Sequence, residues 1–480
     1  MPEARQDESA VRRRVAEAGQ EHVFRCWDTL APDGRAHLLA QLAEIDFEEL
    51  ATLVEEHVAQ RRDPELPPDL APAPFIPLPK TEAEWVRRRE VAAIGEEVIA
   101  AGKVAAFVVA GGQGTRLGYE GPKGSFPIGP VSRRPLFQVF ADGILAARRA
   151  WGASIPWYVM TSRANDRETR DFFDAHNYFG LPRGEVKCFA QGMMPAVDFQ
   201  GKLILADRGQ LAWSPDGHGG SIRALARSGM LADMASRGIE YISYFQVDNP
   251  LAPPVDPVFI GCHADAASDM SSKMARKRDP KERIGAFCLS RGRLHVVEYS
   301  DLPDALAEAT GPDGALRFAA GSIAIHILSR GFVERLTAGG RFALPFHRAE
   351  KKIACVDADG RPHTPENANG IKFETFVFDA LPMAERPVVL EIDRACEFSP
   401  VKNAEGEDSP ATAERDMIRL AAAMLEEAGV EVPRDADCTP SVRVEINPLA
   451  ARNGDELTEL AARRRIRRIT RDLYLDIEDA

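Results

Sequence analysis

The chain has 480 residues, of which 45% are hydrophobic, and a formal net charge of -13. This length allows one large α/β core with smaller appendages. The acidic balance disfavours nucleic acid or an acidic membrane as a general partner, and no run of about 18 apolar residues predicts a membrane-spanning helix. The charged start, MPEARQDESAVRRR, has no apolar segment of the kind found in secretory signals. We therefore expect a cytoplasmic protein.

The seven cysteines are scattered and include no C-x-x-C pair. Neither a disulfide framework nor a zinc site is indicated by this arrangement. We expect reduced thiols, most of them buried.

The first 80 residues predict a small helical unit. Apolar residues recur at helical spacing from residue 8 to about 60, and Pro32-Asp-Gly is expected to divide this stretch into two helices. Seven prolines between Pro64 and Pro79 predict a stiff, extended connector. A further helix is expected from about Glu82 to Ala101, ended by Gly102.

Apolar strands alternate with helical segments from Val104 onward. Strands are expected at 104–109, 157–160, 186–189 and 241–247, and helices at 136–151, 166–176 and 221–237. This alternation predicts an α/β fold with a doubly wound, mainly parallel, Rossmann-like sheet, in a catalytic domain spanning residues 81–404. Shorter strands between 284 and 356 indicate an antiparallel layer. A small C-terminal domain is expected over residues 405–480, with helices ending near Gly429 and spanning 455–470.

A glycine-rich loop follows the first of these strands. Gly111, Gly112 and Gly114 come directly after it, and Arg116 and Lys123 follow the glycines. Backbone N–H groups that lack neighbouring Cβ atoms can approach an anion closely, and two cations lie beside them. This combination predicts a polyphosphate site.

Two common phosphate motifs are excluded by spacing. A P-loop requires Gly-Lys-Ser/Thr at its end, whereas Lys123 lies between Pro122 and Gly124. A dinucleotide fingerprint requires G-x-G-x-x-G, whereas Gly112, Gly114 and Gly118 form G-x-G-x-x-x-G. The loop spacing thus argues against a dinucleotide-dependent oxidoreductase.

Asp248 ends the strand predicted at 241–247. A carboxylate at the carboxyl end of a strand can hold Mg²⁺, which prefers oxygen ligands and bridges phosphates. We predict that Asp248 is the metal ligand, with Mg²⁺, or Mn²⁺ in its place, as the cofactor.

The run GGQGTRLG followed by PKG resembles the signature of nucleotidyltransferases that make sugar nucleotides. It is most similar to the UDP-sugar pyrophosphorylase family, and above all to UDP-N-acetylhexosamine pyrophosphorylases. Further segments resemble motifs of the same family, in the same order along the chain: QGMMPA at 191–196, PDGHGG at 215–220, VDN at 247–249, GSI at 321–323, NGIKFETFVFD at 369–379 and EFSPVKN at 397–403. The resemblance extends from about Lys80 to the C-terminus.

The resemblance implies a role for each matching position. The nucleotide would be bound by Gly111, Gly112, Gly114, Gln191 and Gly217, and the phosphates by Arg116, Lys123 and Lys402. The sugar would be contacted by His218, Gly285, Glu298, Tyr299, Ser322, Phe376 and Phe378. Ser322 stands where the family has asparagine. His218 fits the family loop, which has asparagine or histidine there, but departs from the animal N-acetylhexosamine enzymes, in which asparagine is expected. Both departures bear on which sugar is used.

The reaction implied is a uridylyl transfer, in which UTP and a hexose 1-phosphate form a UDP-sugar and pyrophosphate. N-acetylglucosamine 1-phosphate is the first choice, and glucose or galactose 1-phosphate is the alternative that His218 and Ser322 support. A UDP-sugar-binding regulator without catalysis is an alternative from another class. The sequence leaves the oligomeric state open.

Overall fold

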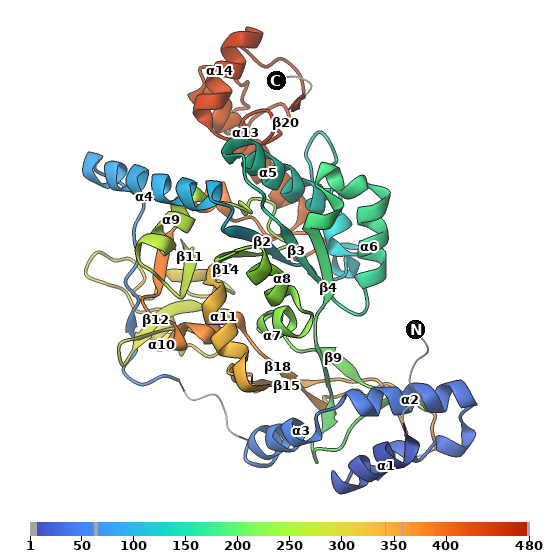
Figure 1. The fold of residues 1–480 in the computed structure, drawn as a ribbon. Helices are drawn as coiled ribbons and strands as arrows, with labels where there is room; N and C mark the ends of the chain where they lie inside the picture. Colours follow the sequence, from blue (N-terminus) through green and yellow to red (C-terminus); the bar gives the residue numbers. More distant parts are fainter. Residues whose placement is uncertain (1–6, 62–65, 341, 358, 478–480) are drawn as a thin grey trace. The chain divides into compact units, whose positions relative to one another are not determined.

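The computed structural model describes residues 7–61, 66–340, 342–357 and 359–477 (Figure 1). These residues form two compact units. One unit comprises residues 1–66, 191–223 and 343–379, and the other comprises residues 67–190, 224–342 and 380–480. In the parts of the chain that are described, no helix combines the length and the apolar character needed to cross a membrane.

A ten-stranded sheet forms the centre of the larger unit, in which β2, β3 and β4 lie side by side (Figure 1). The main path through the sheet is β1-β12-β14-β10-β2-β3-β4, with β11 beside β14, β19 beside β11, and β13 beside β12. The strands are β1 (Ala71–Pro72), β2 (Val104–Val109), β3 (Trp157–Thr161), β4 (Val186–Ala190), β10 (Tyr241–Gln246), β11 (Met270–Arg276), β12 (Ala286–Ser290), β13 (Arg293–Val297), β14 (Ala320–Ser329) and β19 (Val388–Glu391).

The centre of this sheet is parallel, as predicted. β10, β2, β3 and β4 pair in parallel with continuous register, and β11 pairs in parallel with β19. In β3, the consecutive residues Trp157 and Tyr158 point to opposite faces of the sheet, and both are fully buried. Both faces of the sheet are therefore covered, which is typical of a doubly wound fold.

Helices pack on this sheet at several places. α9 contacts β11, β14 and β19 and is itself covered by α4, while α6 contacts β4 and α11 contacts both β14 and α8. The helices of the larger unit are α4 (Glu82–Ala100), α5 (Leu136–Trp151), α6 (Asp166–Ala175), α8 (Met230–Ser236), α9 (Pro257–Asp265), α10 (Asp304–Ala307), α11 (Arg330–Thr337), α12 (Arg394–Glu397), α13 (Pro410–Glu427) and α14 (Gly454–Arg464).

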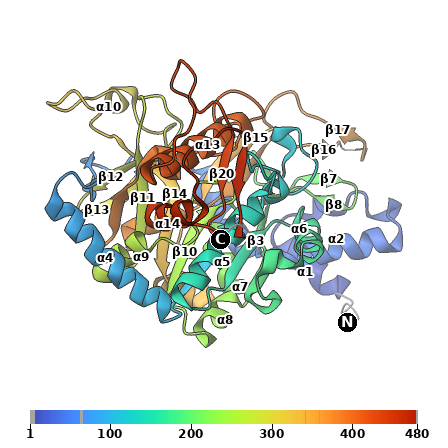
Figure 2. The same cartoon turned by 90° about the horizontal axis from the view of Figure 1, so that it is seen from above.

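The C-terminal residues of the larger unit have a hydrophobic cluster of their own. Leu425, Leu457, Leu460 and Leu475 are buried in it. The cluster lies among α13, α14 and the parallel pair β20 (Val444–Ile446) and β21 (Leu473–Leu475), and α13, α14 and β20 lie together in both views (Figures 1 and 2).

The smaller unit packs the N-terminal helices on short strands from the middle of the chain. Helices α1 (Glu8–Glu17), α2 (Pro32–Glu44) and α3 (Phe47–Val54) share a core with Val197, Ile371 and Phe373. Its sheets include β15 (His347–Lys351) with β18 (Gly370–Glu374) and β6 (Val197–Asp198), and β5 (Met193–Pro195) with β9 (Trp213–Pro215). The two compact units therefore do not begin or end at residues 80 and 404, where domain boundaries were expected. The division into three domains stays a prediction.

Several predicted elements have different bounds in the structure. The N-terminal run is divided at Pro32, as predicted, because the fixed φ and missing N–H of proline suit the first turn of α2. The run nevertheless contains a further helix, α3, which was not expected. The helix expected at 221–237 is two helices, α7 (Gly220–Arg227) and α8, separated at Gly229 with φ 79°. The final helix ends at Arg464, because Arg465 adopts the left-handed conformation with φ 57°. In the proline-rich connector, Ile76 pairs with Leu390 of β19.

Helices α4 and α9 cross at two glycines. A Cβ atom on Gly261 would lie 1.7 Å from the Val91 carbonyl oxygen, and one on Gly95 would lie 1.9 Å from the Pro257 oxygen. Both obstructions are backbone atoms, so they cannot move aside by changing a rotamer. Only glycine permits this closeness of the two helices.

Gly261→Ala is expected to lower the free energy of unfolding by about 3 kcal/mol, because the helices must separate. Gly331→Ala on α11 is the matched control, since a Cβ there meets no atom within 4 Å. This control is expected to change stability by no more than about 1 kcal/mol, in the stabilising direction. Urea denaturation of both variants measures the difference, and equal midpoints would contradict the packing argument.

Candidate functional site

The glycine-rich loop lies at the carboxyl end of β2 and is held by a buried asparagine. Asn165 is fully buried and donates from its side-chain nitrogen to the carbonyl oxygens of Ala110 (2.9 Å) and Gly112 (3.2 Å). The Lys123 N–H also donates to the Gly112 oxygen (3.0 Å). These bonds fix the loop that contains Gly111, Gly112 and Gly114 and connect it to the segment that contains Lys123.

Three predicted site segments meet at the backbone of Val401. The Val401 N–H donates to the carbonyl oxygen of Asp248 (2.7 Å), and Lys123 Nζ donates to the Val401 carbonyl oxygen (3.2 Å). Val401 is fully buried and directly precedes Lys402. The structure therefore brings Lys123, Asp248 and the Lys402 segment together, as the predicted phosphate site requires.

Asn249 joins two of these segments through its side chain. Its Nδ2 donates to the Glu397 carbonyl oxygen (2.7 Å), and its Oδ1 accepts from the Ser399 N–H (3.0 Å). Because Asn249 is only 3% exposed, these bonds lie out of water, where an unpaired amide would be costly. The amide thus ties the Asp248 segment to the residues that lead to Lys402.

The cations of this site have few acidic partners. Arg116 is exposed, and neither it nor Lys123 forms an ion pair with any residue that the structure describes. Lys402 Nζ lies 3.8 Å from Asp408 Oδ2, and this pair is partly exposed and correspondingly weak. Positive charge is therefore available for an anion at the carboxyl end of β2.

Asp248 fits the role of a single protein ligand to a magnesium ion. It is partly buried, and its carboxylate accepts no hydrogen bond and forms no ion pair with the residues in the described ranges. No group of three or more His, Cys, Asp or Glu side chains among those residues could hold a metal. This donor set suits Mg²⁺, which proteins commonly hold through one or two carboxylates together with substrate phosphates.

A second group of predicted residues lies near the same edge of the sheet. β14 runs antiparallel to β10 with Tyr244 opposite His326, which places Ser322, near the start of β14, toward the end of β10. The Ser322 N–H donates to the Gly285 oxygen (2.8 Å), and a Cβ on Gly285 would lie 3.5 Å from Glu298 Oε1. Gly285, Glu298 and Ser322 therefore lie together, whereas Tyr299 is 46% exposed.

In the smaller unit, Gln191 is occupied by contacts within the protein. Its Nε2 donates to Asp216 Oδ1 (2.9 Å) and to the Gly217 oxygen (2.6 Å), and only 8% of the residue is exposed. Gly217 has φ 80°, and a Cβ there would lie 2.3 Å from the Thr375 oxygen. The second glycine-rich loop is thus pressed against residue 375, and Gln191 orders it from the other side.

His218 packs against two aromatic rings of the same unit. Its ring centroid lies 5.3 Å from that of Phe376 and 5.6 Å from that of Phe378. Both phenylalanines lie beyond β18, which ends at Glu374, and Phe378 belongs to a 3₁₀ helix that begins at Val377. The two rings stack on each other, with centroids 5.2 Å apart.

The protonation of His218 follows from its surroundings. Its Nδ1 accepts from the Val377 N–H (3.2 Å), so the neutral ring carries its hydrogen on Nε2. Burial, with a smaller contribution from His347, lowers the pKa of His218 to about 4. At neutral pH, His218 is therefore an uncharged ring that presents one N–H donor. An asparagine side chain also offers an N–H donor, so the histidine retains that capacity.

Sequence reasoning missed the residues that order the site without matching a ligand-binding motif. Asn165 and Thr375 use their side chains to bind backbone groups far away in the chain, and Val401 acts through its own backbone. An asparagine following a strand by a few residues is the one signal that could have indicated Asn165.

A family model described as UTP–glucose-1-phosphate uridylyltransferase matches residues 78–428. The chain belongs to this family. It is 38% identical to the human UDP-N-acetylhexosamine pyrophosphorylase-like protein 1, over 94% of each chain. It is 34% identical to the UDP-N-acetylglucosamine pyrophosphorylase of Saccharomyces cerevisiae, over 92% of this chain and 95% of that one.

Solved structures of family members share the fold. The UDP-N-acetylglucosamine pyrophosphorylase of Trypanosoma brucei, crystallised with an inhibitor, is 27% identical and covers both chains fully, with a TM-score of 0.84. A mutant of the UDP-glucose pyrophosphorylase of Leishmania major, crystallised with UDP-glucose, is 15% identical, with a TM-score of 0.60 over 90% of this chain and 88% of that one. The second likeness concerns the fold alone.

The tautomer and charge of His218 can be measured by ¹⁵N NMR of the ring nitrogens. We expect Nε2 to carry the proton and the ring to stay neutral down to about pH 5, because its folded-state pKa is about 4. Since the unfolded ring protonates near pH 6.5, this group stabilises the fold fully above that pH and less as the pH falls toward 4. His218→Gln should remove the signal and this pH dependence of stability, and a midpoint between pH 6 and 7 would contradict the argument.

Proposed function

We propose that the chain is a uridylyltransferase that converts UTP and N-acetylglucosamine 1-phosphate into UDP-N-acetylglucosamine and pyrophosphate. The observation that carries the proposal is the meeting of Lys123, Asp248 and the Lys402 segment at Val401. Relatives named as UDP-N-acetylglucosamine or UDP-N-acetylhexosamine pyrophosphorylases support it along almost the whole chain.

The reaction forms one P–O bond and breaks another. A phosphate oxygen of the sugar phosphate attacks the α-phosphorus of UTP, and the bond to the β-phosphate breaks as pyrophosphate leaves. The attacking oxygen is already ionised at neutral pH, so the protein has no proton to remove. Its contribution is to place the two substrates and to stabilise the charge that builds on the phosphates.

Each residue of the site has a corresponding task. The backbone of Gly111, Gly112 and Gly114 would cradle the triphosphate, and Arg116 and Lys123 would hold the leaving pyrophosphate. Lys402 would contact the phosphate of the sugar substrate. Because Lys123 donates to a carbonyl oxygen and not to a carboxylate, its charge is left for the substrate.

Asp248 would hold Mg²⁺, the metal that we infer for this reaction, with Mn²⁺ as a substitute. A Mg²⁺ ion held by Asp248 would offset the negative charge of the phosphates. The bond from Val401 to the Asp248 carbonyl oxygen fixes the backbone beside this carboxylate. Asp248 thereby stays close to the segment that contains Lys402.

A plain hexose 1-phosphate is the second candidate for the sugar substrate. Ser322 offers one hydroxyl where the family has an amide, and the matching family model is described by glucose 1-phosphate. His218 instead favours N-acetylglucosamine 1-phosphate, because its ring offers an N–H donor as the asparagine of the N-acetylhexosamine enzymes does. Gln191, Gly217, Phe376 and Phe378 would contribute to nucleotide and sugar binding in the smaller unit, and Gly285, Glu298 and Tyr299 would contribute to sugar binding in the larger.

Lys123→Met is expected to lower kcat about 100-fold or more, because it removes a preorganised charge from the leaving pyrophosphate. Lys103→Met is the matched control, since Lys103 precedes the opposite end of β2 and pairs with Glu240 (3.0 Å) on the surface. This control should keep the wild-type rate. Pyrophosphate release and circular dichroism test both variants, and a Lys123→Met enzyme of normal rate would remove Lys123 from the mechanism.

Four sugar 1-phosphates, tested in parallel with UTP and Mg²⁺, identify the substrate. We expect pyrophosphate release to be fastest with N-acetylglucosamine 1-phosphate, ahead of the N-acetylgalactosamine, glucose and galactose 1-phosphates. A preference for glucose or galactose 1-phosphate would indicate that Ser322 has changed which sugar the site accepts. Binding of UDP-sugar without pyrophosphate release from any of the four would instead favour a regulator.

A further inference from the structure

One lysine of the larger unit is completely buried. Lys273 lies in the middle of β11, and none of its surface is exposed. Its Nζ donates to Asp256 Oδ2 (2.5 Å) and to Glu397 Oε2, and it lies 5.3 Å from the centroid of the Phe259 ring. Burial opposes the charge, but the two carboxylates outweigh this effect and raise the pKa of Lys273. The lysine is therefore an ammonium ion held out of water.

Stability alone does not account for this buried ionic group. Removing charges from water is costly, and buried ion pairs are often no more stabilising than apolar side chains of the same volume. The side chains of Asp256 and Glu397 are only 16% and 17% exposed, so the carboxylates have also lost most of their water. What such a group can supply is a defined position for the segments that it joins.

Asp256 ends the segment that begins with Asp248, the predicted metal ligand. Its Oδ1 accepts from the Val258 N–H (2.9 Å) and so caps the start of α9, while its Oδ2 accepts from Lys273. Helix α9 itself packs on β11 and β14. The far end of the Asp248 segment is thereby fixed to the sheet.

Glu397 is bound through both its side chain and its backbone. Its carboxylate accepts from Lys273, and its carbonyl oxygen accepts from Asn249 Nδ2 (2.7 Å). Glu397 is the last residue of α12 and leads into the stretch that contains Val401 and Lys402. It therefore connects the buried ammonium to the segments that contain the predicted phosphate site.

The two segments that meet at Val401 are thus joined a second time, through Lys273. At the site, bonds of Val401 and Asn249 link the segments. Behind the site, one ammonium binds a carboxylate from each segment. The bonds form a closed ring, so a displacement of either segment would strain the bonds at both junctions.

The pairing of β11 with β14 is irregular at the same lysine. The register between the two strands shifts there, so that residues 323–325 of β14 stand opposite Lys273 alone. Ala324 in this bulge has φ 56°, a conformation that residues other than glycine seldom adopt. Bulges are common beside functional sites, where they redirect side chains, and this one lies next to Ser322. The irregular pairing therefore coincides with the residue that joins the two segments.

We propose that Lys273 is a positioning residue for the uridylyl transfer, acting through its two carboxylate partners. By fixing both segments behind Val401, it sets the separation between Asp248 and Lys402. Because Lys273 is completely buried, it acts without touching a substrate. The catalytic part of this inference rests on the proposed function, whereas the positioning part does not.

A double substitution, Lys273→Met with Glu397→Gln, removes the ammonium together with one of its carboxylate partners. Glu397→Gln alone is the conservative variant, because its amide oxygen can still accept from Lys273. Arg148→Met with Glu185→Gln is the matched control. This partly buried pair joins α5 to the residue before β4, at the opposite edge of the sheet.

Hydrogen exchange of the full chain, followed by mass spectrometry, measures positioning without any substrate. In the double variant, peptides that contain Val401 should exchange at least about tenfold faster, because the bond from its N–H to Asp248 opens more often. In Glu397→Gln alone and in the control, exchange there should stay close to the wild-type rate. Wild-type exchange at Val401 in a folded double variant would overturn the proposal.

The catalytic part is tested by pyrophosphate release from UTP and N-acetylglucosamine 1-phosphate over a series of Mg²⁺ concentrations. The double variant should lower kcat at least about tenfold and require more Mg²⁺ for its half-maximal rate, because the groups around the phosphates are misplaced. Glu397→Gln alone should recover most of the wild-type rate, and the control should keep it. An unchanged kcat in the double variant, or an equal loss in the control, would overturn the catalytic part.

Lys273→Gln with Glu397→Gln replaces the double variant if urea denaturation shows that the methionine form is unfolded. It leaves a hydrogen-bonding group at each position, and the same results are expected from it. If the wild type makes no UDP-sugar from any of the four sugar phosphates, the proposed function and the catalytic part fail together. Exchange at Val401 still decides the positioning part.

Discussion

The backbone of Val401 is the point on which the predicted phosphate site depends. Its N–H binds the carbonyl oxygen of Asp248 and its carbonyl oxygen accepts from Lys123, so one peptide segment positions a carboxylate and a cation. The three segments are separated by more than a hundred residues along the chain. Because they follow different strands of the sheet, they meet only when that sheet is assembled with parallel strands in register. The site is therefore complete only in the assembled sheet.

The parts that could be predicted from the sequence are those determined by local pattern. β2 and α5 have the predicted bounds. A short β-branched apolar run favours a buried strand, and a long amphipathic run favours a helix, so each pattern indicates one element. The glycine loop and Asp248 could be placed at strand ends for the same reason. The bounds of α2 could not, since proline both ends a helix and begins one, and only the packing of the smaller unit decides between these roles.

The residues that sequence reasoning missed act over distance. Asn165 binds Ala110 and Gly112 more than fifty residues earlier, and Thr375 binds the backbone of Asp216 across a still longer separation. Amide and hydroxyl side chains of this kind are common on loops, so nothing local marks the ones that bind a remote carbonyl. The sequence also does not show where β18 ends. Phe376 and Phe378 are two residues apart, as side chains on one face of a strand are, but both lie beyond the last residue of β18.

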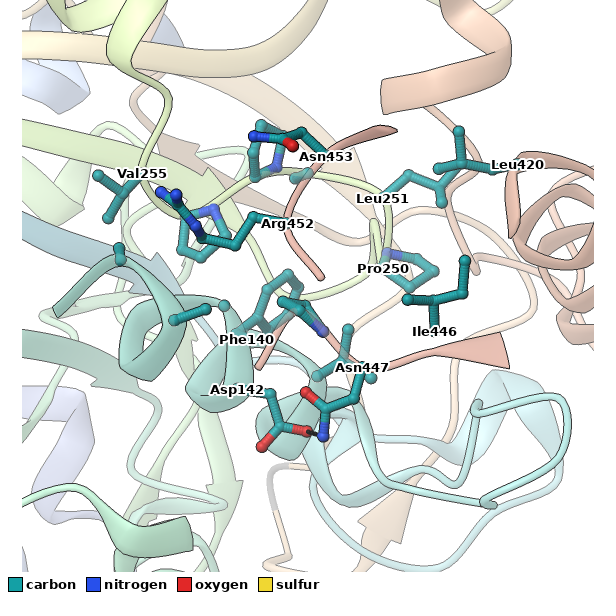
Figure 3. Close-up of a pocket in the computed structure, with 18 of the residues that line it drawn as sticks. Phe140, Asp142, Pro250, Leu251, Val255, Leu420, Ile446, Asn447, Arg452 and Asn453 are labelled. Atoms are coloured by element: carbon teal, nitrogen blue, oxygen red, sulfur yellow. Dashed lines mark hydrogen bonds between the residues drawn. The ribbon is translucent and has the colours of Figure 1, made fainter. Parts of the chain in front are cut away.

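The distribution of paired and unpaired charge separates two kinds of site in the larger unit. At the glycine loop, Arg116 and Lys123 lack carboxylate partners within the described ranges, so a phosphate can supply the missing charge. A mainly apolar cavity lies among α5, the loop at 250–255 and α13 (Figure 3), and there Arg134 and Arg452 already have carboxylate partners, so a phosphate would have to displace them. Because the chain as a whole has a net charge of -13, a local group of unpaired cations indicates a site for an anion. Where arginines are instead paired, shape and apolar area decide what can bind.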